Sequence, residues 1–230
     1  MAVTIINKDS LGFLKALSKN NNREWFNAHK ARYQAAHENI IAFADAVLAG
    51  LNKHDNIETV SGKAGMFRIY KDVRFSKEKI PYNTHWSCAF KRATNKLRGG
   101  YYFRIQSGNS GLVGGFWAPN APDMQRIRQD IDLNYTDWRK LLSRKSLTDT
   151  FGDLYGEQVS SAPRGYSKDH PAIDLLRYKQ FLLKKTFTDK EVLSPGFLQQ
   201  VNNTFKKIRP FFDYMSEVLT TNANGESIVE

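Results

Sequence analysis

The chain has 230 residues, 41% of them hydrophobic and 25% charged, with a formal net charge of +11. This is an ordinary globular composition, which excludes collagen-like, low-complexity and wholly disordered proteins. The single cysteine, Cys88, cannot form an internal disulfide, so a disulfide-stapled secreted scaffold is excluded as well.

The N-terminal third is predicted to be helical. Residues 10–17 have the spacing of a short helix with its apolar side chains turned inward. From an N-cap at Asn21 or Asn22, apolar residues recur every three to four positions as far as residues 50–53. This spacing predicts one long amphipathic helix of about thirty residues.

The middle of the chain changes to a period of two. Residues 66–75 alternate, with Phe67 and Ile69 among the apolar side chains on one face and charged side chains on the other. This alternation predicts a half-buried strand. Further strands are expected over residues 85–91, 100–106, 112–117 and 180–187. The turn-rich residues 107–111 favour antiparallel pairing.

Helices return after residue 120. Pro122 opens a helical stretch, and Thr136 is expected to cap a second short helix. Thr188 and Glu191 have the spacing of a capping box. The last long helix is expected to begin near residues 194–195.

This order of helices, strands and helices predicts an α+β fold. We expect a single domain over residues 1–221, with an antiparallel sheet of about four to six strands packed against long N- and C-terminal helices. Residues 222–230 are expected to form a frayed tail.

The positive charge is concentrated in one part of the chain. Residues 61–110 carry eleven basic and two acidic side chains, which is nearly the whole excess. Within them, the predicted strand over 66–75 places Arg68, Asp72 and Arg74 on one polar face. Asp72 can orient one guanidinium, which leaves the other free to bind an anion bidentately.

Further candidates follow in the next turn and on a later strand. His85 is expected to lie near the end of the 66–75 strand, and Arg104 joins the same basic face if the strand over 100–106 lies next to it. The expected ligand-binding residues are Arg68, Lys71, Arg74, Lys79, Tyr82 and Arg104, with Tyr82 as a hydrogen-bond donor. The candidate catalytic residues are Asp72, Glu78 and His85, with His170 as a further acid or base.

Several common site motifs are missing from the sequence. The glycine-dense residues 111–117 are neither a Walker loop nor a dinucleotide-binding motif, so their glycines are expected to allow a bulge or a close backbone approach to a ligand. No serine-hydrolase elbow is found. No histidine pair has metal-ligand spacing, so no metal or other cofactor is expected.

Residues 68–82 resemble the signature of a bacterial family of uncharacterised proteins of about this length, which reads Arg-x-x-Arg-Asp-x-Arg-Phe and then Asp-Lys and Tyr. The resemblance extends over most of the chain, through Gly100-Tyr-Tyr, Gly114-Gly-Phe-Trp, His170–Arg177 and Leu193–Pro195. The chain departs at Lys71, where the family has Arg, and at Glu78, where it has Asp. The resemblance implies a boundary and a site, but it implies no reaction.

The leading hypothesis is therefore a cytoplasmic protein that binds a phosphate- or carboxylate-bearing small molecule on a basic sheet face. A metal-independent phosphoryl or glycosyl reaction at the same face is left open. One alternative is a nucleic-acid-binding module, in which the basic residues contact backbone phosphates. Another is a structural or interaction protein, in which the charged strand face only organises the fold. No membrane partner is expected because no window is long and apolar enough to span one.

Overall fold

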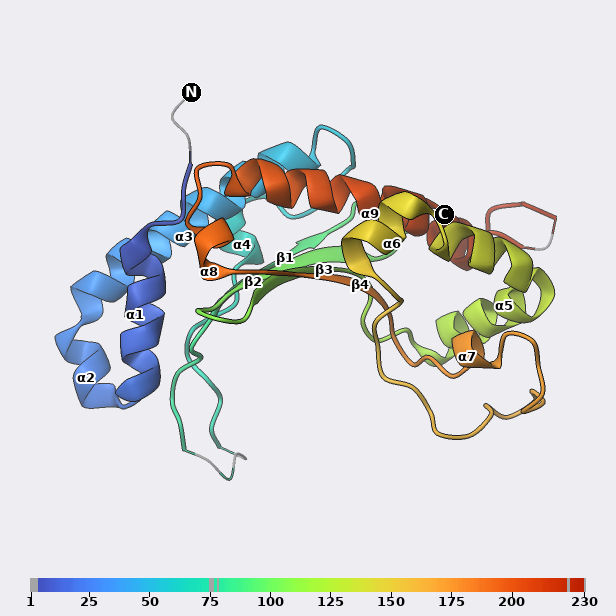
Figure 1. Ribbon diagram of the computed structural model, residues 1–230, viewed down its shortest axis with the longest axis horizontal. Coiled ribbons are helices and arrows are strands. Elements are labelled where there is room, and N and C mark those ends of the chain that lie inside the picture. The colour runs from blue at the N-terminus through green and yellow to red at the C-terminus, as the bar shows by residue number, and fades with distance from the viewer. Residues whose placement is uncertain (1–3, 75–76, 78, 223, 230) are drawn as a thin grey trace. The chain divides into compact units, whose positions relative to one another are not determined.

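The computed structural model describes residues 4–74, 77, 79–222 and 224–229 (Figure 1). Its helices are α1 (Lys8–Lys19), α2 (Arg23–Ala28), α3 (Lys30–Leu51), α4 (Gly62–Gly65), α5 (Ala121–Leu142), α6 (Lys145–Phe151), α7 (Ile173–Leu176), α8 (Asp189–Val192) and α9 (Phe197–Thr220). Its strands are β1 (Trp86–Lys91), β2 (Gly100–Ile105), β3 (Ser110–Phe116) and β4 (Phe181–Phe187).

The four strands form one antiparallel sheet in the order β1-β2-β3-β4. Each of the strands predicted after residue 85 is confirmed to within about two residues of its observed ends. Buried and half-buried residues alternate along β2 and β3, as expected where only one face of a sheet packs against helices. The α+β class with an antiparallel sheet and long helices is therefore confirmed.

The strand predicted over residues 66–75 is wrong. Its described residues, 66–74, pair with residues 81–88 only through the isolated bridges Met66↔Cys88 and Tyr70↔Tyr82, and they form no strand of the sheet. Ile69 is buried, but Phe67 is 55% exposed because it turns toward the open face of the sheet. Of the remaining apolar positions, Val73 is half-buried and Phe75 lies outside the described residues.

The single long helix predicted from residue 21 onward is also wrong in one respect. The helix is divided at His29, whose backbone has φ −110° and ψ 21°. The His29 ring lies 2.8 Å from the Trp25 carbonyl oxygen through Nδ1 and stacks on the Trp25 ring at 4.0 Å. The Trp25 carbonyl thus contacts the His29 ring while it also accepts from the His29 N–H at 3.1 Å. The N-cap is confirmed, since Asn22 accepts from the Trp25 N–H at 2.9 Å.

The chain divides into two compact units. The first consists of residues 1–90, 102–112 and 186–203, and the second of residues 91–101, 113–185 and 204–230. The predicted boundaries of a single domain over 1–221 and of the tail stay predictions. None of the helices in the described ranges is long and apolar enough to cross a membrane.

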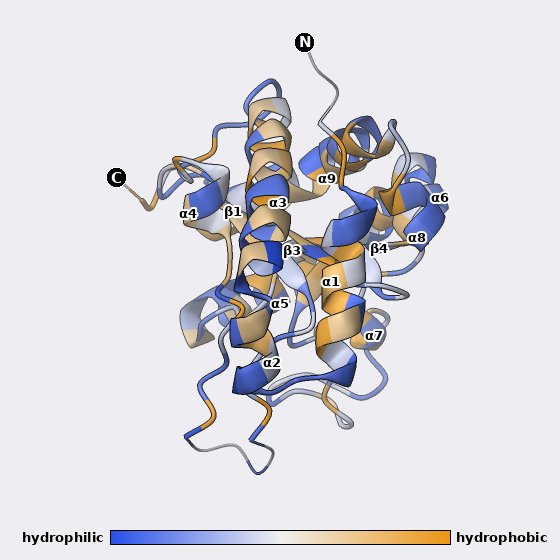
Figure 2. Ribbon diagram, turned by 90° about the vertical axis from the view of Figure 1, so that its left-hand side faces the viewer, coloured by the Kyte–Doolittle hydropathy of each residue, from blue (hydrophilic) through white to orange (hydrophobic). Residues whose placement is uncertain are grey.

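An aromatic core holds the first unit together. Phe26 stacks on Tyr82 at 4.1 Å, and Phe13 stacks on Trp86 at 6.0 Å. The Trp86 indole N–H also donates to the Ser10 carbonyl at 3.2 Å, which ties β1 to α1. Figure 2 shows apolar residues along α1 and α3 and hydrophilic residues in the segment that joins α1 to α2. Burial of these faces positions the start of β1, where the candidate site lies.

The second unit is organised around α5 and most of α9. Asp130 accepts hydrogen bonds from the Trp138 indole at 2.7 Å, the Tyr214 hydroxyl at 2.8 Å and the Asn134 amide at 2.8 Å. Asn134 has non-helical φ and ψ values inside α5, so the two predicted helices meet at a kink there. One carboxylate thereby ties the kinked α5 to α9.

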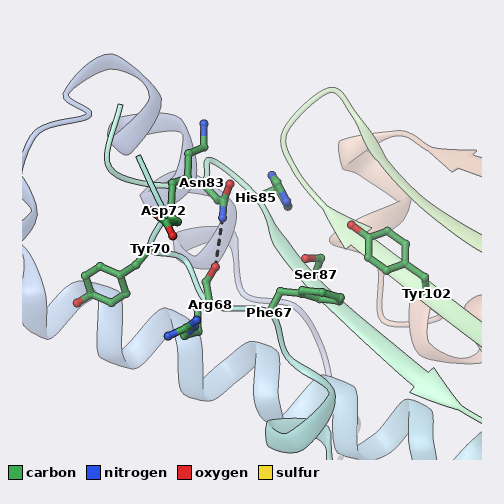
Figure 3. A pocket seen from close by; sticks show the side chains of 9 residues that line it. Phe67, Arg68, Tyr70, Asp72, Asn83, His85, Ser87 and Tyr102 are labelled. Carbon is green, nitrogen blue, oxygen red and sulfur yellow. Dashed lines mark hydrogen bonds between the residues drawn. The ribbon is translucent and has the colours of Figure 1, made fainter. Parts of the chain in front are cut away.

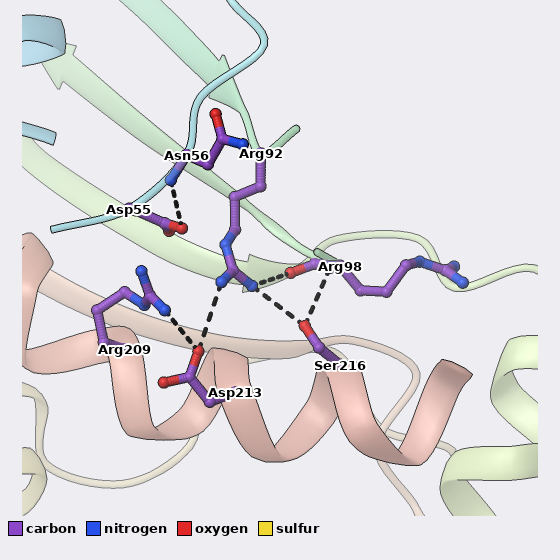
Figure 4. Close-up of polar contacts among 7 residues, drawn as sticks. All are labelled: Asp55, Asn56, Arg92, Arg98, Arg209, Asp213 and Ser216. Carbon is purple, nitrogen blue, oxygen red and sulfur yellow. Dashed lines mark hydrogen bonds and ion pairs between the residues drawn. The ribbon is translucent and has the colours of Figure 1, made fainter. Parts of the chain in front are cut away.

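Buried Arg92 forms a second polar centre in this unit. Its guanidinium donates to the Arg98 carbonyl at 2.8 Å and to the Ser216 hydroxyl at 3.1 Å, and it lies 3.5 Å from Asp213 (Figure 4). The same guanidinium sits over the Phe212 ring, 4.9 Å from its centroid. These contacts compensate for burying a charged side chain.

The glycines of β3 serve packing within the second unit, and not the approach to a ligand suggested by the sequence. A Cβ atom at Gly115, where φ is +147°, would collide with the Phe181 carbonyl oxygen of β4. A Cβ atom at Gly114 would collide with Ile208 of α9. Only glycine permits both approaches, because it has no side chain.

Candidate functional site

A hollow of about 500 Å³ lies on the open face of β1 and β2 in the first unit. It is lined by Phe67, Arg68, Tyr70, Lys71, Asp72, Asn83, His85, Ser87 and Tyr102. Figure 3 shows the side chains of Phe67, His85, Ser87 and Tyr102 grouped around one space. The hollow is therefore built from three adjacent stretches of chain.

Backbone pairing sets the register of these stretches. The Phe67 N–H donates to the Ser87 carbonyl at 2.9 Å, and the Asn83 N–H donates to the Ile69 carbonyl at 2.7 Å. Residues 66–71 consequently lie beside the start of β1, and β1 lies beside β2. Side chains of the same face then meet across β1, and the rings of Phe67 and Tyr102 pack edge to face at 6.1 Å and 69°.

His85 lies among positive charges. Burial, the Arg104 guanidinium and the Lys71 ammonium together lower the pKa of His85 to about 4. Its imidazole is therefore neutral at pH 7, with one nitrogen that donates and one that accepts. Arg104, on β2, is close enough to His85 to act on it although residues 66–75 are not its neighbours in the sheet.

Arg104 is incompletely paired. Its Nη2 donates to the Gln106 side-chain oxygen, but its Nε is buried and has no hydrogen-bond partner among the described residues. A buried donor without an acceptor costs about 1–3 kcal/mol in a folded protein. Arg104 does not itself line the hollow, and within the described part of the chain the hydrogen-bonding capacity of its Nε is unused.

One family model matches most of the chain. The model of a conserved hypothetical protein family, DUF2461, matches residues 9–214. The chain belongs to the DUF2461 family. The expected membership in a family of unknown function is thereby confirmed, and the match assigns no reaction to the hollow. No curated protein and no solved structure matches the chain.

Of the six predicted binding residues of this DUF2461 chain, two line the hollow and three make contacts within the chain. The sixth, Arg104, is not a lining residue, although its charge acts on His85. Arg68 and Lys71 line the hollow, together with the predicted catalytic residues Asp72 and His85. Glu78 lies outside the described residues. The other three are Arg74, Lys79 and Tyr82.

Asp72 and Arg74 form an exposed ion pair. Arg74 Nη2 lies 2.6 Å from Asp72 Oδ2, and Nε donates to Oδ1 at 3.0 Å. The side-chain hydrogen bond from Arg74 holds the pKa of the Asp72 carboxyl below its ordinary value. Asp72 is therefore ionised at neutral pH, so it accepts hydrogen bonds but has no proton to donate as a general acid.

Lys79 and Tyr82 support the loop and the core. The Lys79 ammonium donates to the Val73 carbonyl at 3.0 Å. Tyr82 is 3% exposed and stacks on Phe26, so its ring belongs to the aromatic core and does not line the hollow.

His170, the second acid or base candidate, lies in the second unit and has both ring nitrogens engaged. Nδ1 accepts from the Ala172 N–H at 3.0 Å, and Nε2 lies 2.9 Å from Asp132 Oδ1. A backbone N–H can donate only to an unprotonated nitrogen, so the proton is on Nε2. His170 holds the end of the preceding loop against α5.

Sequence reasoning missed Asn83 and Ser87 as lining residues, and it placed Phe67 in the core. The available signal for Ser87 was the strand predicted over 85–91, in which residues 85 and 87 share a face, although the observed β1 begins at Trp86. Over the described ranges, no three His, Cys, Asp or Glu side chains converge as metal ligands.

Proposed function

We propose that this DUF2461 protein binds a small molecule bearing a phosphate or carboxylate group in the hollow on β1 and β2. Arg104, Lys71 and Arg68 hold the anion, and His85 contacts it as a neutral hydrogen-bonding group. The observation that carries the proposal is the buried Nε of Arg104, which lacks an acceptor among the described residues of a strongly basic face.

The charges around the hollow support the same conclusion. Asp72 is the single carboxylate among the nine lining residues, and its charge is offset by Arg74. Arg68, Lys71 and nearby Arg104 are cations. A concave site with this balance attracts anions and raises their local concentration.

His85 is the residue best placed to move a proton if the bound ligand reacts. A bound anion offsets the charges of Lys71 and Arg104, which raises the pKa of His85 toward the range of an acid–base catalyst. Asp72 is held ionised by Arg74 and orients that guanidinium. The proposal includes a cytoplasmic location for the protein. Any catalysis in the hollow is proposed to proceed without a metal ion.

The test is direct binding of phosphates and carboxylates to the full chain and to Arg104→Met. Methionine removes the charge and the unpaired donor but keeps an apolar stem of similar length. We expect Arg104→Met to weaken anion binding about tenfold or more, as the loss of a charge-assisted hydrogen bond predicts. Lys15→Met removes an exposed cation on α1 and should leave binding unchanged. Equal binding by wild type and Arg104→Met would contradict the proposal.

A nucleic-acid interface is a second candidate, favoured by the loop over residues 67–83. Within it, Tyr70 is 53% exposed and lies between Arg68 and Lys71 in the sequence. Aromatic rings among cations can stack bases while cations contact phosphates. This function requires oligonucleotide affinity that falls steeply with salt, whereas a small-molecule site is expected to retain its ligand preference.

A purely structural role of the charged loop is the third possibility. The contacts of Asp72 with Arg74 and of Lys79 with the Val73 carbonyl favour it, since they organise the loop without any ligand. In that case Arg68→Ala would lower the melting temperature, and neither the wild type nor the variant would bind an anion.

A further inference from the structure

Aromatic side chains are gathered around the candidate anion site. Phe67, Tyr70 and Tyr102 all line the hollow. Phe67 is 55% exposed and Tyr70 is 53% exposed, although most large aromatic residues of the first unit are buried. A cluster of exposed aromatic surface at one concave place is typical of a binding site, whereas single exposed residues are common everywhere.

The geometry of Phe67 leaves part of its ring available. Phe67 and Tyr102 pack edge to face, with 69° between their planes. In such a pair each ring has at least one face that its partner does not cover. Pairing of the Phe67 N–H with the Ser87 carbonyl at 2.9 Å fixes the backbone beneath the ring. The hollow therefore offers an aromatic surface that is already in place.

The aromatic surface and the cations are close enough for one small ligand to contact both. Tyr102 and Arg104 lie two residues apart on the same face of β2, so their Cα atoms are about 7 Å apart along the strand. The hollow measures about 500 Å³, which is within the range of small-molecule sites. A ligand in which one linking group joins a planar ring to an anionic group would span the distance between Tyr102 and Arg104.

We propose that the ligand joins its anion to a planar ring, as a nucleoside monophosphate does, and that this ring stacks against Phe67 beside Tyr102. The inference rests on the proposed function, because the anion is held by Arg104 and Lys71. It adds the substrate class: a planar anionic compound, in preference to inorganic phosphate or a simple sugar phosphate.

The experiment measures affinities of the full chain for inorganic phosphate, ribose 5-phosphate and adenosine 5′-monophosphate at about 0.15 M salt. Base stacking on an aromatic side chain predicts that the nucleotide binds at least about fivefold more tightly than ribose 5-phosphate. Phe67→Leu keeps apolar bulk but removes the ring, so it should abolish most of that preference. Trp117→Leu removes an exposed ring that does not line the hollow and should leave the preference unchanged.

The outcomes separate the two proposals. If ribose 5-phosphate and the nucleotide bind equally well, or if Phe67→Leu keeps the full preference, the planar-ring inference is wrong while the anion site stands. If none of the three compounds binds, or if Arg104→Met leaves their affinities unchanged, the proposed function fails and the inference fails with it.

Discussion

Arg92 and Arg104 are two partly or fully buried arginines that differ in how their donors are used. Arg92, in the second unit, has a fully buried side chain whose contacts include the Arg98 carbonyl, the Ser216 hydroxyl and Asp213 (Figure 4). Arg104, in the first unit, bonds Gln106 and keeps a buried Nε without a partner among the described residues. Under the proposed function, Arg92 stabilises the fold, whereas Arg104 serves the bound anion.

The two histidines predicted as acids or bases, His85 and His170, also differ in how their ring nitrogens are paired. His170 uses one ring nitrogen to accept from the Ala172 N–H and the other to contact Asp132. His85 faces two cations, Arg104 and Lys71, which contribute to lowering its pKa. A polar group that is fully paired within the chain is a poor candidate for function, even when its residue type suits catalysis.

The largest expected difference between Arg92 and Arg104 is in their contribution to stability. Arg92→Met removes the buried donor to the Arg98 carbonyl and one of the two donors to the Ser216 hydroxyl, which keeps the Arg98 N–H. We expect a loss of about 3 kcal/mol in the free energy of unfolding, measured by urea denaturation. Arg104→Met removes an unsatisfied donor and should change the same free energy by less than about 1 kcal/mol. Equal losses in the two variants would show that the two arginines do not differ in role.

The smallest expected effect concerns the exposed ion pair. Asp72→Asn removes the carboxylate that lines the hollow, and both partners of the pair are exposed. The melting temperature should stay unchanged because exposed ion pairs contribute little. Phosphate should bind about two- to fivefold more tightly at low salt, since an anion no longer meets a like charge, and less so at higher salt. Weaker phosphate binding would instead give Asp72 a part in holding the ligand.

Local signals predicted much of the fold. The helical period, the capping box at Thr188 and the alternation of β2 and β3 each depend on neighbouring residues, and the structure confirms them. Residues 66–75 have the same alternation, but a strand also requires a continuous partner, which a local pattern cannot reveal. The N-terminal helix is divided at His29, where the side chain contacts a backbone carbonyl, and no periodic pattern marks this position.

The candidate site was only partly predictable for a related reason. Charge clustering identified the correct stretch of sequence, and Arg68, Lys71, Asp72 and His85 do line one hollow. Sequence alone could not separate these residues from Arg74, Lys79 and Tyr82, because their contacts with Asp72, the Val73 carbonyl and Phe26 exist only in the folded chain. Nor could it reveal that the Arg104 guanidinium on β2 helps to lower the pKa of His85.

The most direct test of the anion site is an NMR titration of the His85 ring with and without a saturating phosphate-bearing ligand. Without ligand, we expect the pKa of His85 to be about 4, well below the ordinary value of 6.5. An anion held by Arg104 and Lys71 favours the protonated ring, so the pKa should rise. By linkage, protonation of His85 should then favour binding as pH falls from 7 toward 5, while protonation of the phosphate, with its second pKa of about 6, acts in the opposite direction. A His85 pKa that the ligand leaves unchanged would contradict an anion at this place.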